Sequence, residues 1–412
     1  MKGVALLLAT LLLTTIGQAS HAQNDAPPER RQLALAGVCA FAPMSPEERL
    51  KACRQVLEQR RLSNQAAALA NLGLAEGLRL SNQPAAALDA ADAAVSRAPE
   101  FAAALLSRGA AHLALDDASA AIGDASRAID LQRGNPAGYM LRAEAYLRQG
   151  RPAFALGDMD EAVEIAPDVA RVRLVRAYVN LAMARPDAAL GDARAALKLD
   201  PELTSAYVVR SRIYMATGKY ARAAADAGRA VDLAPADRSA LDAAAVAFTE
   251  VARFDRAEDA VDKLVALAPR DADALNARCW TLALKPEPKA ALKDCDAALA
   301  IEPNHFQARD SRAFVYWQMG RRDEAAAELD KAAELQPDFW DWSKREGYFS
   351  TLMARRYLRA LGHYDGPLDG EFENDAATPE AIRAYETKHG MPSTGAASPE
   401  LLARLKADVT GR

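Results

Sequence analysis

Prolines recur along this chain at a constant interval, and no other feature constrains its fold as much. Seven of them stand 34 or 68 residues apart: Pro99, Pro167, Pro201, Pro235, Pro269, Pro303 and Pro337. With these prolines at repeat position 32, eight ungapped repeats of 34 residues occupy residues 68–339. A fixed period of this length is typical of stacked supersecondary units.

Residues that end or start helices keep the same register. Position 15 is glycine in Gly150, Gly218 and Gly320, and position 17 is proline in Pro84, Pro152, Pro186 and Pro288. Glycine accepts the left-handed conformation that follows a helix, and proline suits the first turn of one. Each repeat is therefore predicted to form two antiparallel helices joined by a short turn.

Small and aromatic residues complete the pattern. Position 20 is alanine in all eight repeats, position 8 is a small residue in seven, and position 11 is aromatic in Tyr146, Tyr214, Phe248 and Tyr316. Together with the proline at position 32, this resembles the tetratricopeptide repeat. The resemblance implies an all-α fold: an α-solenoid of helix pairs, wound as a right-handed superhelix, whose first helices line a concave face.

Six repeats also share an arginine at position 7 and an acid at position 23. The arginines are Arg108, Arg142, Arg176, Arg210, Arg278 and Arg312; the acids are Asp124, Asp158, Asp192, Asp226, Asp294 and Glu328. The other two repeats lack both residues, and only pairing within a repeat matches every presence and absence. We therefore expect ion pairs that join the two helices of a repeat; a solvated charged face is the alternative.

Four cysteines indicate two local disulfides. Cys279 and Cys295 take positions 8 and 24 of one repeat, which face the partner helix, while Cys39 and Cys53 flank a predicted helix start at Ser45 and Glu48. These pairs are one of three possible connectivities. Zinc binding is the alternative, although no CxxC or clustered histidine accompanies the cysteines. We expect no metal and no cofactor.

The resemblance also implies a binding groove along positions 2, 5, 9 and 12 of the first helices. The candidate groove residues are Met140, Glu144, Leu174, Tyr178, Leu181, Val208, Arg212, Met215, Trp280, Phe314 and Trp317. Aromatic and methionine side chains suit capture of a peptide or helix. The alternative is that several of them pack between adjacent repeats.

The last sixty residues differ from the repeats, because the stretch "ALGHYDGPLDGEF" breaks the helical pattern with glycines. Matching residues include Leu358, Leu361, Gly362, Tyr364, Gly366, Pro367, Asp369, Gly370, Phe372, Thr378, Ile382, Tyr385, Gly390, Gly395 and Leu402. They make this segment similar to the three-helix peptidoglycan-binding domain of bacteria. Thr378 is expected to cap the second helix ahead of Pro379. The alternative is a module kept for packing or for a protein partner.

Within this segment, four side chains are candidate contacts to peptidoglycan. They are Tyr364, Asp365, Asp369 and Phe372. The aspartates can accept hydrogen bonds from the polymer, and the two rings offer flat apolar surfaces. In the alternative reading, Asp369 caps the turn and Phe372 belongs to the core.

The N-terminus predicts export. Lys2 precedes an uncharged apolar run at residues 4–16, and Ser20 and Ala22 stand before an expected cut ahead of Gln23. This is the layout of a secretory signal peptide, and the run is shorter than a membrane-spanning helix needs. The expected segments are 1–22 signal peptide, 23–67 linker and capping hairpin, 68–339 repeats, 340–351 capping helix and linker, and 352–412 the wall-binding-type domain.

These features favour a non-enzymatic, periplasmic or otherwise exported adapter. Its repeats would hold an unidentified protein or peptide, and its last domain would contact the cell wall. The formal net charge of −5 disfavours nucleic acid as a partner, and we expect no membrane contact after the signal is removed. A protein-only interaction role and a cell-wall hydrolase are the two alternatives.

Overall fold

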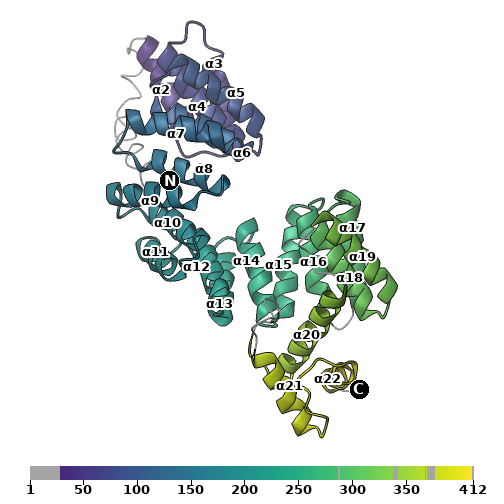
Figure 1. Ribbon diagram of the computed structural model, residues 1–412. Helices are drawn as coiled ribbons and strands as arrows, with labels where there is room; N and C mark the ends of the chain where they lie inside the picture. The colour runs from purple at the N-terminus through teal and green to yellow at the C-terminus, as the bar shows by residue number, and fades with distance from the viewer. Residues whose placement is uncertain (1–27, 286–287, 337–341, 367, 369–375, 411–412) are drawn as a thin grey trace. The chain divides into compact units, whose positions relative to one another are not determined.

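The structure is a computed structural model that describes residues 28–285, 288–336, 342–366, 368 and 376–410 (Figure 1). The expected signal peptide lies outside these residues. Contacts divide the chain into two compact units, Met1–Asp192 and Ala193–Arg412. All regular structure in the described ranges is helical, as predicted. None of the helices found there is both long and apolar enough to cross a bilayer.

The first unit begins with a helical hairpin and continues as helix pairs. Its elements are α2 (Pro28–Phe41), α3 (Pro46–Leu57), α4 (Asn64–Leu80), α5 (Pro84–Arg97), α6 (Ala102–Ala114), α7 (Ala118–Leu131), α8 (Pro136–Arg148), α9 (Pro152–Ile165) and α10 (Ala170–Ala182). Helix α11 (Pro186–Leu199) contains the boundary between the units.

The second unit continues the pairs and ends with three further helices. Its elements are α12 (Thr204–Ala216), α13 (Tyr220–Leu233), α14 (Arg238–Glu250), α15 (Phe254–Leu267), α16 (Ala272–Ala283), the 3₁₀ helix η2 (Pro288–Ala291), α17 (Leu292–Ile301), α18 (Phe306–Gln318), α19 (Arg322–Leu335), α20 (Trp342–Ala360), α21 (Ala377–Lys388) and α22 (Pro399–Thr410).

The 34-residue register sets where the helices begin. Every first helix from α6 to α18 begins at position 1, and every second helix begins at position 17, with η2 in that place in the seventh repeat. Only α4 departs, because Ser63 caps it and it starts four residues earlier. The prediction of two helices per repeat is confirmed.

The turn at position 15 keeps its left-handed backbone even where glycine is missing. Gly150, Gly218 and Gly320 have φ of +67°, +67° and +75°. Asn82, Asp116, Ala184 and Ala252 take the same place in four other repeats, with φ between 53° and 61°. Asparagine and aspartate tolerate a left-handed conformation, but it costs an alanine roughly 1–2 kcal/mol. At Ala184 and Ala252, the packing of the repeats therefore imposes this turn against local preference.

Position 20 explains how closely the paired helices approach. Its alanines are Ala87, Ala121, Ala155, Ala189, Ala223, Ala257, Ala291 and Ala325, and none is more than 1% exposed. A larger side chain at this point would have to displace the facing helix. The recurring small residues therefore set the spacing of the array.

The N-terminal hairpin is joined by the disulfide Cys39–Cys53, whose Cα atoms lie 5.2 Å apart. Ser45 and Glu48 form the predicted capping box at the start of α3. Arg49 reinforces the hairpin, because its guanidinium donates to the carbonyl oxygens of Cys39, Ala40 and Ala42.

The C-terminal helices differ from the expectation of a separate domain after a linker. Helix α20 runs without a break through the expected boundary at residue 352, and Figure 1 shows it passing from the last repeat toward α21 and α22. One apolar core spans both sides of that boundary, from Phe314 and Phe349 to Leu405. The expected capping helix at 340–351 is present as the start of α20, with Phe349 against Phe314 and Trp317 of the last repeat. The expected linker is corrected, because the C-terminal helices share their core with the last repeats.

The start of α21 is a second correction. Its N-cap is Ala376, and Thr378 lies inside the first turn. The Thr378 hydroxyl instead accepts a hydrogen bond of 2.8 Å from Nε of Arg355, a side chain with no exposed surface. A buried guanidinium requires hydrogen-bond acceptors. The Thr378 hydroxyl therefore accepts from Arg355 of α20 and does not cap α21.

Candidate functional site

The first helices are fixed to their partners by the predicted ion pairs. In all six repeats, Nη2 of the arginine at position 7 lies 2.6–2.8 Å from a carboxylate oxygen at position 23 of the same repeat. Each acid is buried, while each arginine is partly exposed. Hydrogen bonding to the acid raises the pKa of Arg108, Arg142, Arg176, Arg210 and Arg278. The within-repeat pairing is therefore present in the structure.

Sequence reasoning missed a second contact made by these arginines. In five of the six repeats, Nη1 of the arginine donates to the side chain at position 25 of the preceding repeat. Arg108 contacts Asp92 at 3.1 Å, and Arg142 contacts Ser126 at 3.1 Å. Each of these five guanidinium groups thus joins the two helices of its own repeat and also contacts the second helix of the preceding repeat. The signal was in the sequence, because position 25 carries acids at the same period.

A hollow of about 330 Å³ opens on the first helices of the last three repeats. Its walls come from α14, α16 and α18, and Tyr348 of α20 closes one side. The lining includes Val246, Glu250, Asn276 and Trp280. Val246, Asn276 and Trp280 take positions 9, 5 and 9, so this part of the hollow lies where the repeat pattern predicted a groove, whereas Glu250 takes position 13.

The hollow combines apolar surface with hydrogen-bonding groups. Val246 is 56% exposed, and the Trp280 ring lies partly open beside it. Ser311 donates to Oδ1 of Asn276 at 2.8 Å, which leaves the amide NH₂ of Asn276 with its own donors. An extended peptide could place an apolar side chain on Val246 and Trp280 while its backbone bonds to Asn276 and Gln307.

The disulfide Cys279–Cys295 lies directly behind this hollow. The Cα atoms are 5.3 Å apart, and both side chains are fully buried. Cys279 precedes Trp280 on α16 and joins that helix to α17. The predicted pairing is present, and it fixes the helix that carries the partly exposed Trp280 ring of the hollow.

Two predicted groove residues are placed elsewhere. Phe314 has no exposed surface, and Trp317 is 8% exposed. Their rings lie 5.0 Å and 5.8 Å from that of Phe349 on α20. The expectation that they line the groove is corrected. Helix α20 covers the last repeat at this point, so both side chains belong to the hydrophobic core.

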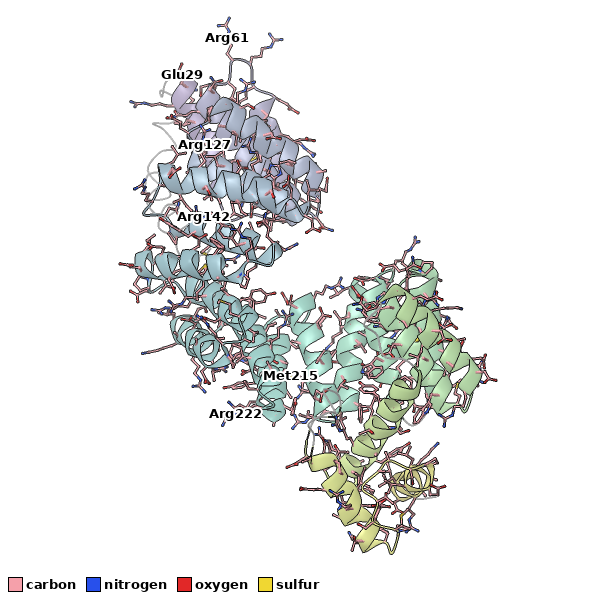
Figure 2. All side chains as sticks on the ribbon, viewed as in Figure 1. Glu29, Arg61, Arg127, Arg142, Met215 and Arg222 are labelled. Carbon is pink, nitrogen blue, oxygen red and sulfur yellow. A yellow bond between two sulfur atoms is a disulfide. The ribbon has the colours of Figure 1, made fainter. Side chains whose placement is uncertain are left out.

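The remaining predicted groove residues differ in exposure. Tyr178 is 45% exposed, whereas Leu174 and Val208 are buried, at 8% and 5%. Exposed or partly exposed side chains are those of Met140, Glu144, Leu181, Arg212 and Met215; Figure 2 labels Met215 on α12. Val246, Asn276 and Asp310 were missed, although they take groove positions 9, 5 and 5.

The glycine-rich segment near the C-terminus is the second candidate site. Tyr364 is 7% exposed and Leu368 is fully buried, while Asp365 is exposed. A Cβ added to Gly366 would lie 2.4 Å from Oη of Tyr364, so the ring of Tyr364 requires glycine there. Asp369 and Phe372 lie outside the described residues. Of the four expected wall contacts, Asp365 is the one described residue that is open to solvent.

Family comparisons match both parts of the chain. One tetratricopeptide repeat model matches residues 72–136, 120–170 and 174–238, and a second matches residues 307–339. A model described as "Putative peptidoglycan binding domain" matches residues 351–405. A search of curated proteins finds no match.

Solved structures with similar folds are also tetratricopeptide repeat proteins or contain such chains. A crystal structure of the APC/C hetero-tetramer Cut9–Hcn1 aligns with 77% of this chain and 62% of its own, at 14% identity and a TM-score of 0.58. The thermophilic repeat protein TTC0263 of Thermus thermophilus aligns with 44% of this chain and 99% of its own, at 22% identity and a TM-score of 0.42.

Repeats of this kind indicate a scaffold for protein–protein interaction, and the C-terminal match suggests contact with peptidoglycan. The repeat assignment agrees with the helix register and with the hollow on the first helices. The chain carries tetratricopeptide repeats in residues 72–170, 174–238 and 307–339 and ends in helices that match a putative peptidoglycan-binding domain at residues 351–405.

Proposed function

We propose that this protein is an exported, periplasmic adapter without enzymatic activity, which binds a protein segment through its repeats and contacts the cell wall through its C-terminal helices. The observation that carries the proposal is the joining of the two parts by α20. Tyr348 of this helix lines the hollow, and the match to the peptidoglycan-binding family begins within the same helix, at residue 351.

The chemistry of the hollow favours an extended peptide as its occupant. Neutral amides at Asn276 and Gln307 can bond to backbone groups of any sequence, while Trp280 and Val246 offer an apolar site for one side chain. This division between backbone hydrogen bonds and a side-chain pocket is common in peptide recognition. It supports a protein partner rather than a small substrate.

The cysteines support the exported location. All four form disulfides in the structure, with no free thiol in the described chain. Disulfides of this kind persist in oxidising compartments and are rare in the cytosol. Together with the predicted signal peptide, they favour the periplasm.

Partner binding is tested with one groove variant and one matched control. Trp280→Ala removes the partly exposed ring of the hollow, whereas Phe154→Ala removes a ring that is 55% exposed on a second helix. Proteins captured from periplasmic extract by the wild type and by Phe154→Ala, but lost with Trp280→Ala, support the proposal. Equal capture by all three proteins contradicts binding in the hollow.

Wall contact is tested by sedimentation with purified sacculi, using muramidase-digested sacculi as the control. Ending the chain at Phe349 is unsuitable as a deletion, because it cuts α20 and exposes the shared core. The full-length protein is expected to sediment with intact sacculi. Equal sedimentation with and without sacculi contradicts the wall contact.

A protein-only interaction role is the second candidate. The burial of Tyr364 and Leu368 favours it, because these side chains are not open to a polymer in this arrangement. In that case, the hollow variants change partner capture and no form of the protein sediments with sacculi.

A further inference from the structure

Glu250 belongs both to the hollow and to the contact with the glycine-rich segment. It is the last residue of α14, it is 6% exposed, and it lines the hollow on the last three repeats. Its Oε2 also accepts a hydrogen bond of 2.9 Å from the backbone N–H of Leu368. A single residue therefore lines the hollow and binds the glycine-rich segment through its carboxylate. We name residues 362–366 and 368 the docked loop.

Arginines of α20 strengthen this contact. The guanidinium of Arg359 donates to the backbone carbonyl of Glu250 and lies 5.8 Å from the ring centroid of Tyr364. Arg356 is 6% exposed and lies 5.5 Å from the ring of Phe254, at the start of α15. The sixth repeat thus contacts α20 through these two arginines and the docked loop through the hydrogen bond between Glu250 and the fully buried Leu368.

The hollow has an acidic character. Among the described residues, its lining contains the acidic residues Glu250 and Asp310 and no lysine, arginine or histidine. Val246 stands one turn before Glu250 on the same helix, and residues at i and i+4 are neighbours on a helix surface. A positive group resting on the exposed side chain of Val246 would therefore lie within reach of Glu250.

We propose that Glu250 couples the hollow to the docked loop: a basic side chain of a bound peptide draws the carboxylate into the hollow, and the amide of Leu368 is released. The inference rests on the proposed function for the identity of the occupant as a peptide. The bound peptide would carry a basic residue. Its binding would release the docked loop and thereby uncover Tyr364.

Val246→Arg tests the coupling without an identified partner. The new guanidinium stands four residues before Glu250 and acts as a tethered basic side chain. Because Val246 is 56% exposed, the fold is expected to tolerate the change. Hydrogen exchange, followed by mass spectrometry on the full chain, should become about tenfold faster or more in the docked loop, as expected for the loss of a charge-assisted hydrogen bond.

Three variants separate charge from size. Val246→Met adds length without charge and should leave exchange of the docked loop unchanged. Val246→Lys should act as Val246→Arg does. Glu250→Gln keeps an acceptor oxygen for Leu368 but removes the charge, so Val246→Arg should have no further effect in that background. Exchange in α21 and far-UV circular dichroism should match the wild type throughout.

The outcomes that overturn the coupling are distinct from those that overturn wall contact. Unchanged exchange in Val246→Arg and Val246→Lys overturns it, and so does an equal acceleration by Val246→Met or in the Glu250→Gln background. Sedimentation with sacculi is measured separately on the same variants. Faster exchange with greater retention supports both ideas; faster exchange with no retention by any variant supports the coupling and contradicts wall contact.

Discussion

Arg210 donates from Nε and Nη2 to the two carboxylate oxygens of Asp226, at 2.7 Å each. The two residues lie sixteen positions apart and join α12 to α13 within one repeat. This pair differs from the other five in one respect: position 25 of the preceding repeat holds Arg194, where other repeats offer an acid or Ser126. The ion pair within a repeat can therefore be measured at Arg210 and Asp226 without a second contact from the arginine to position 25 of the preceding repeat.

We expect Arg210→Ala and Asp226→Ala to destabilise the protein and to be coupled. The side chain of Asp226 is 10% exposed, so removing Arg210 leaves a buried carboxylate without its bidentate partner. Breaking a buried ion pair costs on the order of 3 kcal/mol. The double variant should cost less than the sum of the single variants, with a coupling energy of about 1–3 kcal/mol, measured by urea unfolding.

The exposed Arg229 on α13 provides the control for this cycle. Arg229→Ala should change the free energy of unfolding by no more than about 0.5 kcal/mol. Additive effects of the two single variants would contradict a direct Arg210–Asp226 interaction.

Local chemistry explains what could be predicted from the sequence. Prolines at position 17 and small residues at positions 8 and 20 act within one repeat, so their spacing is sufficient to locate both helices. The pairing of Arg210 with Asp226 follows from co-occurrence alone, because the two repeats that lack the arginine also lack the acid. The disulfide of Cys279 follows from two positions that face one another across a helix pair.

What could not be predicted depends on contacts between distant segments. The burial of Phe314 requires α20, which the repeat period does not describe. Ala252 adopts a left-handed turn because its neighbours require it, although its own preference is against it. Thr378 stands ahead of Pro379, as an N-cap residue would, but its hydroxyl accepts a hydrogen bond from the buried Arg355. The role of Glu250 depends on Leu368, which lies 118 residues away.

The disulfide of the seventh repeat is expected to contribute to stability rather than to geometry alone. It closes a loop with a sequence separation of 16, for which the loss of unfolded-state entropy corresponds to about 3 kcal/mol. Replacing both Cys279 and Cys295 with alanine should lower the free energy of unfolding by roughly that amount, because position 8 holds alanine in other repeats. Mapping of non-reduced peptides should recover the Cys279–Cys295 and Cys39–Cys53 pairs; crossed pairs or free thiols would contradict them.

Gly366 and Gly347 should respond in opposite directions to substitution by alanine. A Cβ at Gly366 would lie 2.4–3.0 Å from atoms of the Tyr364 ring, so Gly366→Ala should destabilise by about 1–3 kcal/mol. Gly347 lies exposed in α20 with nothing within 4 Å of an added Cβ, so Gly347→Ala should stabilise the helix by about 0.5–1 kcal/mol. Thermal unfolding of both variants tests the packing of Tyr364; a neutral Gly366→Ala would mean that the ring does not cover this glycine.

Tyr385 should make the stability of the C-terminal helices depend on alkaline pH. Its hydroxyl donates to Oδ2 of Asp408 at 2.5 Å and joins α21 to α22. Burial, and then the bond to Asp408, raises the pKa of Tyr385 to about 12, compared with about 10 in an unfolded chain. The folded state therefore holds the phenolic proton more tightly than the unfolded state. This contribution is complete below pH 10 and is lost as the pH rises from about 10 through 12.

Tyr385→Phe isolates that contribution, because the other tyrosines titrate in both proteins. The difference in free energy of unfolding between the wild type and Tyr385→Phe should be constant from pH 7 to 9 and should shift against the wild type from about pH 10 upward. Urea unfolding followed by circular dichroism at pH 7, 9, 10 and 11 measures it. A difference that does not change with pH, or one that shifts in favour of the wild type above pH 10, would contradict a raised pKa and with it the hydrogen bond that joins the last two helices.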